Sequence, residues 1–200
     1  MIGVAREAGL LELTLQRPDK ANALTRAMLG DLLAALEDPP QVLILTGEGR
    51  VFSAGADLDE ARAGLASDPI WDQLSNRIAG LPGLTIAALN GTLAGGAMGM
   101  ALACDLRLAV PGANFFYPVM RLGYLPQPAD PARLVALVGP ARAKLLLMAG
   151  AKIGAEEALS WGLIDRIVAA DELMAAARAL AADVLAAKPG HAGAIKRLIG

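Results

Sequence analysis

Apolar and polar positions alternate near the start of the chain, and continuous apolar runs replace this alternation further along. Leu11, Leu13 and Leu15 alternate with polar residues, a period typical of a half-buried strand. Later runs show no such alternation, and the run after Pro40 ends at Gly47, which indicates a strand covered on both faces. The buried strands predicted in this way lie at 42–45, 84–89 and 106–110, and a short strand is predicted at 163–168.

Helical periodicity fills the segments between these strands. Thr25 is predicted to cap a helix whose leucines, from Leu29 to Leu36, form one apolar stripe. Residues 57–80 read as helical with a break near Asp68, and Asp130 reads as an N-cap followed by proline. Asp171 is expected to open a further helix. Alternating strands and helices predict an α/β chain with a mostly parallel sheet and a helical last third.

Composition narrows the class of protein. The 200 residues are 55% hydrophobic and 19% charged, which excludes a disordered chain. The net charge of −2 gives no polycation for nucleic acid. A single cysteine, Cys104, cannot form an intrachain disulfide and fits a cytoplasmic location. Arg6, Glu7 and Glu12 stand where a signal peptide needs apolar residues. The apolar stretch 85–104 is broken by glycines, so we expect no membrane span.

Two loops rich in small residues follow buried strands and lead into helices: 51–58 (VFSAGADL) and 90–98 (NGTLAGGAM). The start of a helix offers unpaired backbone N–H groups and a partial positive charge. Two such loops side by side could direct two N–H groups at one carbonyl oxygen, which is an oxyanion hole. Composition alone leaves open that these glycines only allow tight packing. The second loop matches neither the dinucleotide fingerprint nor the Walker A pattern.

The order of short motifs resembles the crotonase (enoyl-CoA hydratase/isomerase) superfamily. The motifs are R-P-x-x-x-N-A-L at 17–24, F-S-A-G-A-D-L at 52–58, N-G-x-x-x-G-G at 90–96, A-C-D at 103–105 and G-A-E-E-A-L-x-x-G-L-I at 154–164. The resemblance implies a crotonase-like spiral of ββα units over residues 1–168. A short helical C-terminal segment over 169–200 would follow. It also implies assembly as a homotrimer or a dimer of trimers.

The resemblance further implies a site for an acyl-CoA substrate, with coenzyme A as part of the substrate and no prosthetic group or metal. The N–H groups of Ala56 and Gly96 would form the oxyanion hole on the thioester oxygen. The residues implied at the coenzyme A end are Lys20, Ala54, Asp57 and Leu58, and those at the acyl group are Gly55, Gly95, Val119 and Gln127.

The sequence departs from the family at two positions. Hydratases of the family use two glutamates to activate water, and these positions are Gly99 and Val119 here. Neither side chain can transfer a proton, so ordinary hydration is not expected. Candidate proton carriers are Asp130 and Tyr124, with Tyr117 as a further tyrosine, although a helix cap and packing are the alternatives. We expect packing or surface roles for the remaining conspicuous side chains, Trp71, Cys104, Trp161 and His191. Arg121 could bind a carboxylate of the substrate, or it could lie on a solvent-exposed face.

Three functions follow from this reading. The first is an acyl-CoA enzyme that uses the oxyanion hole for decarboxylation, thioester hydrolysis or double-bond isomerisation. The second is a catalytically silent acyl-CoA-binding or assembly subunit, which the loss of both glutamates favours. The third is a structural α/β protein without a coenzyme A site, which would leave the ordered match of both loops unexplained.

Overall fold

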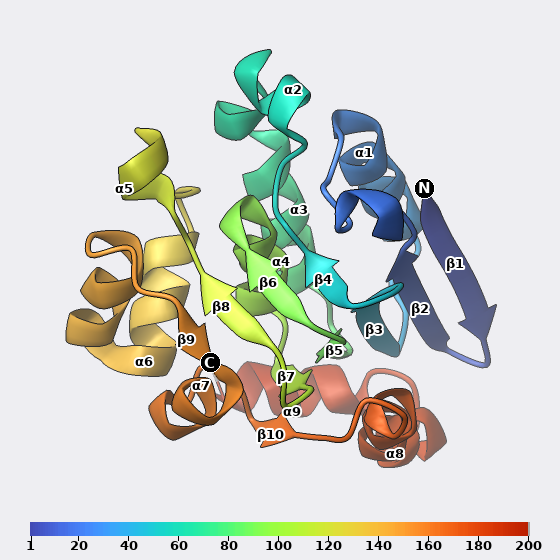
Figure 1. The fold of residues 1–200 in the computed structure, drawn as a ribbon. Coiled ribbons are helices and arrows are strands. Elements are labelled where there is room, and N and C mark those ends of the chain that lie inside the picture. The colour runs from blue at the N-terminus through green and yellow to red at the C-terminus, as the bar shows by residue number, and fades with distance from the viewer. Residues whose placement is uncertain (200) are drawn as a thin grey trace.

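A six-stranded sheet forms the base of the fold (Figure 1). The computed structural model describes residues 1–199. The strand order is β1-β2-β3-β5-β7-β10, with β1 antiparallel to β2 and the other pairs parallel. The strands are β1 (Ile2–Glu7), β2 (Leu10–Leu15), β3 (Val42–Gly47), β5 (Leu84–Leu89), β7 (Leu106–Ala109) and β10 (Arg166–Ile167). The buried strands predicted at 42–45, 84–89 and 106–110 are confirmed. The strand predicted at 163–168 is limited to Arg166–Ile167, and β1 has no counterpart in the sequence prediction.

A second sheet of shorter strands lies in front of the first in Figure 1. Its order is β4 (Val51–Ser53), β6 (Thr92–Ala94), β8 (Asn114–Phe116) and β9 (Ile153–Gly154). Strands β4, β6 and β8 run parallel, and β9 is antiparallel to β8. Each long strand β3, β5 or β7 is followed by one of these short strands and then by a helix. The spiral of ββα units is therefore confirmed.

The helices begin and end largely where local chemistry predicts. They are α1 (Arg26–Ala35), α2 (Leu58–Arg62), α3 (Ile70–Ala79), α4 (Met98–Ala103), α5 (Val119–Leu122), α6 (Asp130–Leu147), α7 (Ala155–Trp161), α8 (Leu173–Ala186) and α9 (His191–Ile199). Thr25 caps α1, because its hydroxyl accepts a hydrogen bond from the Met28 amide at 3.2 Å. Gly139, with φ +80° before Pro140, breaks α6. Helix α8 begins two residues later than Asp171, the start that we predicted.

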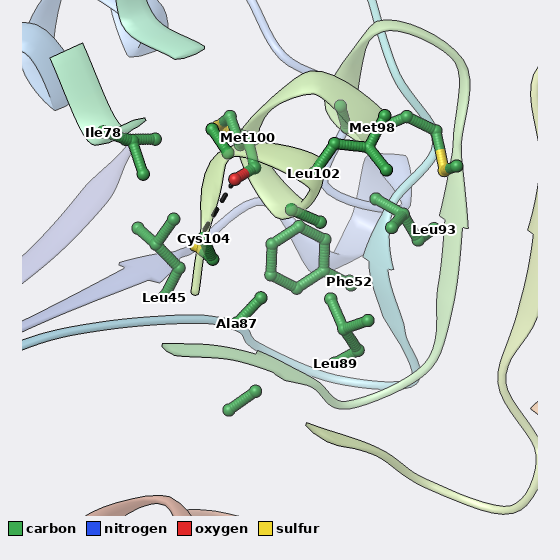
Figure 2. Close-up of a cluster of buried hydrophobic side chains, with 14 of the residues drawn as sticks. Leu45, Phe52, Ile78, Ala87, Leu89, Leu93, Met98, Met100, Leu102 and Cys104 are labelled. Atoms are coloured by element: carbon green, nitrogen blue, oxygen red, sulfur yellow. Dashed lines mark hydrogen bonds between the residues drawn. The ribbon is translucent and has the colours of Figure 1, made fainter. Parts of the chain in front are cut away.

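Leucine, alanine and a few aromatic side chains fill the space between the second sheet and helix α4. Phe52 of β4 is fully buried and lies among Leu89, Leu93 and Leu102 (Figure 2). Burying a phenylalanine of this kind contributes about 1.5–3 kcal/mol. Cys104 lies in the same cluster, and burial raises the pKa of its thiol to about 12, which agrees with a packing role. This cluster supports the strands that lead into both glycine-rich loops.

The last two helices cover the underside of the six-stranded sheet (Figure 1). Helix α8 packs against β3, β5 and β7. Helix α9 is attached by Lys196, whose ammonium group lies 2.8 Å from the Asp105 carboxylate and 3.3 Å from the Gly83 carbonyl. Asp105 also accepts hydrogen bonds from the amide and hydroxyl of Thr85, at 2.8 and 2.9 Å. Across residues 1–199, no helix has the length and apolar character needed to cross a membrane.

Candidate active site

Asn22 organises the chain around the first glycine-rich loop. It is fully buried, and its φ of +51° lies in the left-handed region, which asparagine adopts more readily than most residues. Its side-chain amide donates hydrogen bonds to the carbonyls of Glu48 and Val51, at 2.9 and 2.7 Å. Its side-chain oxygen accepts one from the Arg17 amide at 2.8 Å. One asparagine thus joins three segments, which explains why the motif at 17–24 precedes this loop.

The first loop leaves one backbone N–H group free. Leu24 donates to the Gly55 carbonyl at 2.7 Å and accepts from the Asp57 amide at 2.9 Å. These two bonds form a bridge beside Ala56 but do not use its amide. Within residues 1–199, the Ala56 N–H group donates to no protein oxygen. An amide in this position is available to an external acceptor.

The second loop supplies another such group, and the two loops are in contact. Gly96 is the second residue of the 3-10 turn η3 (Gly95–Ala97), so its amide precedes the first donor that the turn itself pairs. The two loops touch at Gly55, where a Cβ atom would lie 3.0 Å from the Ala94 carbonyl and 3.4 Å from the Gly96 nitrogen. Gly55 also has a φ of +94°, so both space and conformation demand glycine there.

The two loops share one cavity of about 270 Å³ with a mainly apolar lining. The residues singled out from the sequence that line it are Ala54, Ala56, Leu58, Trp71, Gly95, Gly96, Tyr117, Val119, Tyr124 and Gln127. The structure does not bring Lys20, Gly55, Asp57 or Asp130 into this lining. Lys20 is exposed in the turn η1 (Pro18–Lys20). The cavity therefore gathers both candidate oxyanion donors and leaves out the carboxylates.

Asp57 has the capping role that the sequence suggests. Its carboxylate accepts hydrogen bonds from the amides of Asp59 and Glu60 at the start of α2, at 3.1 and 3.4 Å. It also lies 2.7 Å from the Arg17 guanidinium. The hydrogen bond from Arg17 and those from the helix amides lower the pKa of Asp57. Asp57 thus stays charged and fixes the exit of the first loop.

Trp71 of α3 forms the wall behind the second loop. Its indole N–H group donates to the Leu65 carbonyl at 2.8 Å, which fixes the ring. A Cβ atom on Gly96 would lie 3.3 Å from two carbon atoms of that ring. The predicted packing role is confirmed, and the packing is directly against a candidate oxyanion donor. A side chain at position 96 would therefore press on the tryptophan ring.

The prediction that Asp130 caps a helix is wrong. Ala129 is the N-cap residue of α6, and Asp130 is its first residue, with no capping hydrogen bond from its side chain. The carboxyl group turns inward instead, where the Tyr117 hydroxyl donates to its Oδ2 atom at 2.9 Å. The hydrogen bond from Tyr117 holds the carboxyl group away from the amides at the start of the helix. Asp130 is 1% exposed.

Asp130 is an unusual carboxyl group because one of its two oxygen atoms has no hydrogen-bond partner among the described residues. Its Oδ1 atom is buried and accepts no hydrogen bond from any residue that the structure describes. Burial raises the pKa of Asp130 to about 6, although the hydrogen bond from Tyr117 and the charge of Arg133 oppose this shift. This carboxyl group titrates within reach of neutral pH, unlike Asp57.

The two positions that lack glutamate have different surroundings. Val119 begins α5 and lines the cavity. Gly99 is buried in α4, and a Cβ atom there would lie 2.8 Å from the Asp130 Oδ1 atom. The carboxyl group of Asp130 thus occupies the space that a side chain at position 99 would enter. No sequence pattern predicts this contact, because the two residues belong to different helices and no period links them.

One cavity residue could have been found from spacing. Leu58, Ala61 and Arg62 follow the first loop at intervals of three and four, so they share one face of α2, and all of them line the cavity. Arg62 places a guanidinium at the cavity lining, and it also lies 3.1 Å from the exposed Asp59 carboxylate. The sequence prediction named Leu58 but missed this arginine.

Among the other residues considered from the sequence, only Tyr124 borders the cavity. Tyr124 is 40% exposed and lines the cavity. Arg121 is exposed and borders a different cavity with Met120 and Met148. His191 is exposed at the start of α9, as expected. The Trp161 ring stacks under the Arg142 guanidinium at 5.4 Å. Over residues 1–199, no group of three or more His, Cys, Asp or Glu side chains could hold a metal ion.

Comparison with known proteins places the chain in a family. The sequence profile for enoyl-CoA hydratase/isomerase matches residues 5–199. Carnitinyl-CoA dehydratase of Escherichia coli K12 is 37% identical over 98% of this chain and 78% of its own length. The crystal structure of enoyl-CoA hydratase from Bacillus anthracis superposes with a TM-score of 0.90 at 32% identity, covering 99% of this chain and 81% of that one. DspI of Pseudomonas aeruginosa superposes equally well, with a TM-score of 0.90 at 33% identity over 99% of this chain and 85% of that one. The profile match, the identity and the fold together show that this chain belongs to the enoyl-CoA hydratase/isomerase family.

Proposed function

We propose that this chain binds an acyl-CoA thioester in the cavity between the two loops and stabilises an enolate oxyanion formed from it. The observation that carries the proposal is the pair of unused amides, Ala56 and Gly96, on separate loops that touch and line one apolar cavity. Preorganised donors aimed at a developing oxyanion contribute roughly 3–4 kcal/mol each in well-studied enzymes. An apolar lining strengthens this contribution because it excludes water from the charge.

The proposed position of coenzyme A follows from the charges near the cavity. Arg62 lines the cavity from α2, and Lys20 is exposed on the turn that precedes Asn22. Both cations suit the phosphate groups of coenzyme A, which carry negative charge and accept several hydrogen bonds. Ala54 and Leu58 would contact the nucleotide end, with the acyl group beside Gly95, Val119 and Gln127. The name of carnitinyl-CoA dehydratase, a relative at 37% identity, specifies a coenzyme A thioester for that protein, which supports the same substrate class here.

The proposed reaction is enolate chemistry that needs at most one proton carrier. Hydration of a double bond by paired carboxylates would require acid and base groups beside the substrate, and Gly99 and Val119 provide neither. Decarboxylation of a malonyl-type thioester forms the enolate without a base, because the electrons of the breaking C–C bond supply it. Isomerisation of a double bond moves one proton out and back on one carrier. We therefore favour decarboxylation or isomerisation over hydration.

A matched pair of variants tests the proposed oxyanion hole. Gly96→Pro deletes one N–H group, whereas Gly96→Ala places a Cβ against Trp71 in the same way but keeps the amide. Turnover is measured by mass spectrometry on malonyl-, methylmalonyl-, crotonyl- and 3-enoyl-CoA. We expect Gly96→Pro to turn over about 10²–10³-fold more slowly than Gly96→Ala. Equal turnover in two folded variants, or no binding of any of these thioesters to the wild type, would overturn the proposal.

A second candidate function is a silent acyl-CoA-binding subunit, favoured by the absence of a carboxylate at both positions 99 and 119. It differs from the first in a single measurable respect. Calorimetry would detect binding of the thioesters in both cases, but only an enzyme converts one of them. Binding without any conversion across the panel would therefore support the silent subunit.

A further inference from the structure

We propose that Tyr117 and Asp130 form a proton relay in the cavity wall, in which Tyr117 exchanges a proton with the α-carbon of the bound thioester and Asp130 stores it. This inference rests on the proposed function, because it takes an acyl-CoA enolate as the reacting species. It adds a specific proton carrier to a site whose oxyanion donors are backbone amides, which donate hydrogen bonds but do not transfer protons. It also gives a reason for the glycine at position 99.

The geometry separates the two groups by their access to the cavity. Tyr117 lines the cavity, whereas Asp130 does not belong to the lining and is 1% exposed. Their oxygen atoms are joined by a hydrogen bond of 2.9 Å. The Gln127 amide also donates to the Tyr117 hydroxyl, at 3.4 Å, which helps to fix its position. The tyrosine hydroxyl thus offers a hydrogen-bonded route for a proton between the cavity and Asp130.

The charged groups around Asp130 leave its carboxyl group without an ion-pair partner. Arg133 of α6 donates instead to Ser75 Oγ and Asn76 Oδ1 of α3, at 2.9 and 2.7 Å. Asp72 of α3 accepts a hydrogen bond from the Ala129 amide at 3.1 Å. From helix α4, Gly99 lies against the Asp130 carboxyl group. Arg133 favours the charged form of Asp130, whereas burial and Asp72 favour the neutral form.

These surroundings fit a carboxyl group that stores a proton better than one that only makes a structural hydrogen bond. Burial raises the pKa of Asp130 to about 6, so both of its protonation states are accessible near neutral pH. Burial and the neighbouring carboxylate raise the pKa of Tyr117 far above its ordinary value. Tyr117 therefore does not persist as a tyrosinate, and it transfers a proton only when Asp130 gives or takes another in the same step.

The step balances without any further reactant. In the direction that forms the enolate, the α-carbon loses a proton to the Tyr117 oxygen while the Tyr117 hydroxyl proton passes to the Asp130 carboxylate. The electron pair of the C–H bond moves to the thioester oxygen, where the amides of Ala56 and Gly96 hold the charge. In the reverse direction, neutral Asp130 returns its proton to Tyr117 as Tyr117 protonates the α-carbon. Tyr117 ends each step as neutral tyrosine.

Position 99 is part of this arrangement. The unpartnered Oδ1 atom of Asp130 lies where a Cβ on Gly99 would be, at 2.8 Å. Real Cβ contacts essentially never come that close, so the inward carboxyl and a side chain at 99 exclude each other. A glycine at position 99 thus provides the space in which the relay carboxyl sits.

The test uses exchange of α-hydrogens for deuterium in D₂O with butyryl-CoA as the probe, followed by mass spectrometry. We expect Tyr117→Phe and Asp130→Asn each to slow exchange by about 10²-fold or more. Affinity for butyryl-CoA, measured by calorimetry, should stay within about threefold, because neither change removes an oxyanion donor. Tyr124→Phe tests the other tyrosine of the cavity, and loss of exchange in that variant in place of Tyr117→Phe would overturn the relay.

The pH profile separates the relay from a merely structural role. Abstraction of the α-proton needs charged Asp130, so the wild-type exchange rate should rise with pH through about 6 and then level off. Asp130→Asn should lose this inflection. Exchange that is absent in the wild type despite binding, or unchanged in both relay variants, would overturn the relay while leaving the binding proposal intact. Failure of butyryl-CoA to bind the wild type would instead overturn the proposed function and the relay with it.

Discussion

A carboxyl group that is 1% exposed, with one oxygen unpartnered among residues 1–199, costs free energy whenever it is charged, and Asp130 is such a group. Its pKa rises from 3.8 to about 6 on folding, so the folded state binds more protons between these values. The unfolding free energy should therefore fall as pH rises through this window. Relative to Asp130→Asn, the wild type should lose up to about 3 kcal/mol between about pH 4 and about pH 7.5. Urea denaturation at both pH values measures the unfolding free energies of the two proteins. A difference between them that does not change with pH would contradict the prediction.

Gly99 and Asp130 should also be coupled in a double-mutant cycle. Gly99→Ala alone forces a Cβ to within 2.8 Å of the Asp130 carboxylate, and overpacking of this kind costs about 1–3 kcal/mol. In an Asp130→Ala background the obstructing oxygen is gone, so the same change should cost almost nothing. Unfolding free energies of the four proteins give a coupling energy of about 1–3 kcal/mol. Additive effects would show that the two residues do not compete for one space.

At the scale of the element, patterns with a clear period were predictable and short contacts were not. The alternation at Leu11, Leu13 and Leu15 and the cap at Thr25 are local, so the sequence carries them directly. Strands of three residues, such as β4, β6 and β8, are too short to show a period, so the strands of the second sheet were not predicted. The two loops were found because small residues in a row are conspicuous. The Tyr117–Asp130 contact was missed because tertiary packing alone creates it.

The ion pair between Lys196 and Asp105 helps to hold helix α9, which gives a prediction at the scale of the element. Lys196 lies 2.8 Å from Asp105 and 3.3 Å from the Gly83 carbonyl, and α9 also packs closely against Pro82 at its buried Gly193. Both side chains are partly exposed, so the pair contributes about 1 kcal/mol at most. Lys196→Ala should increase hydrogen exchange in α9 by about fivefold without a comparable change in β3. Lys188→Ala, an exposed lysine just before α9, is the control. Equal exchange in both variants would indicate that apolar packing alone holds the helix.

At the scale of the whole molecule, exposed apolar side chains gather around α5 and the end of α6. Met120 and Met148 are each 58% exposed and border one cavity of about 520 Å³. Nearby, Leu122 and Leu125 are 55% and 87% exposed. Monomeric proteins seldom expose apolar side chains in such a group. A surface of this kind fits the homotrimer, or dimer of trimers, that we propose for the chain.

That proposal predicts a mass roughly three or six times the 20.5 kDa of one chain, measurable by light scattering after gel filtration. Met120→Glu combined with Met148→Glu should shift the mass toward a single chain, because charge is disfavoured in the buried core of an interface. Val4→Glu is the matched control, since Val4 is 54% exposed on β1. This strand is an edge of the six-stranded sheet and lies on the other side of the molecule from α5 in Figure 1. A wild type that elutes as a single chain would contradict the proposed assembly. Dissociation of the control but not of the double variant would place the assembly surface elsewhere. If the double variant dissociates yet still binds butyryl-CoA, the cavity is complete within one chain. Loss of binding would instead mean that a neighbouring copy helps to close the cavity beside α5.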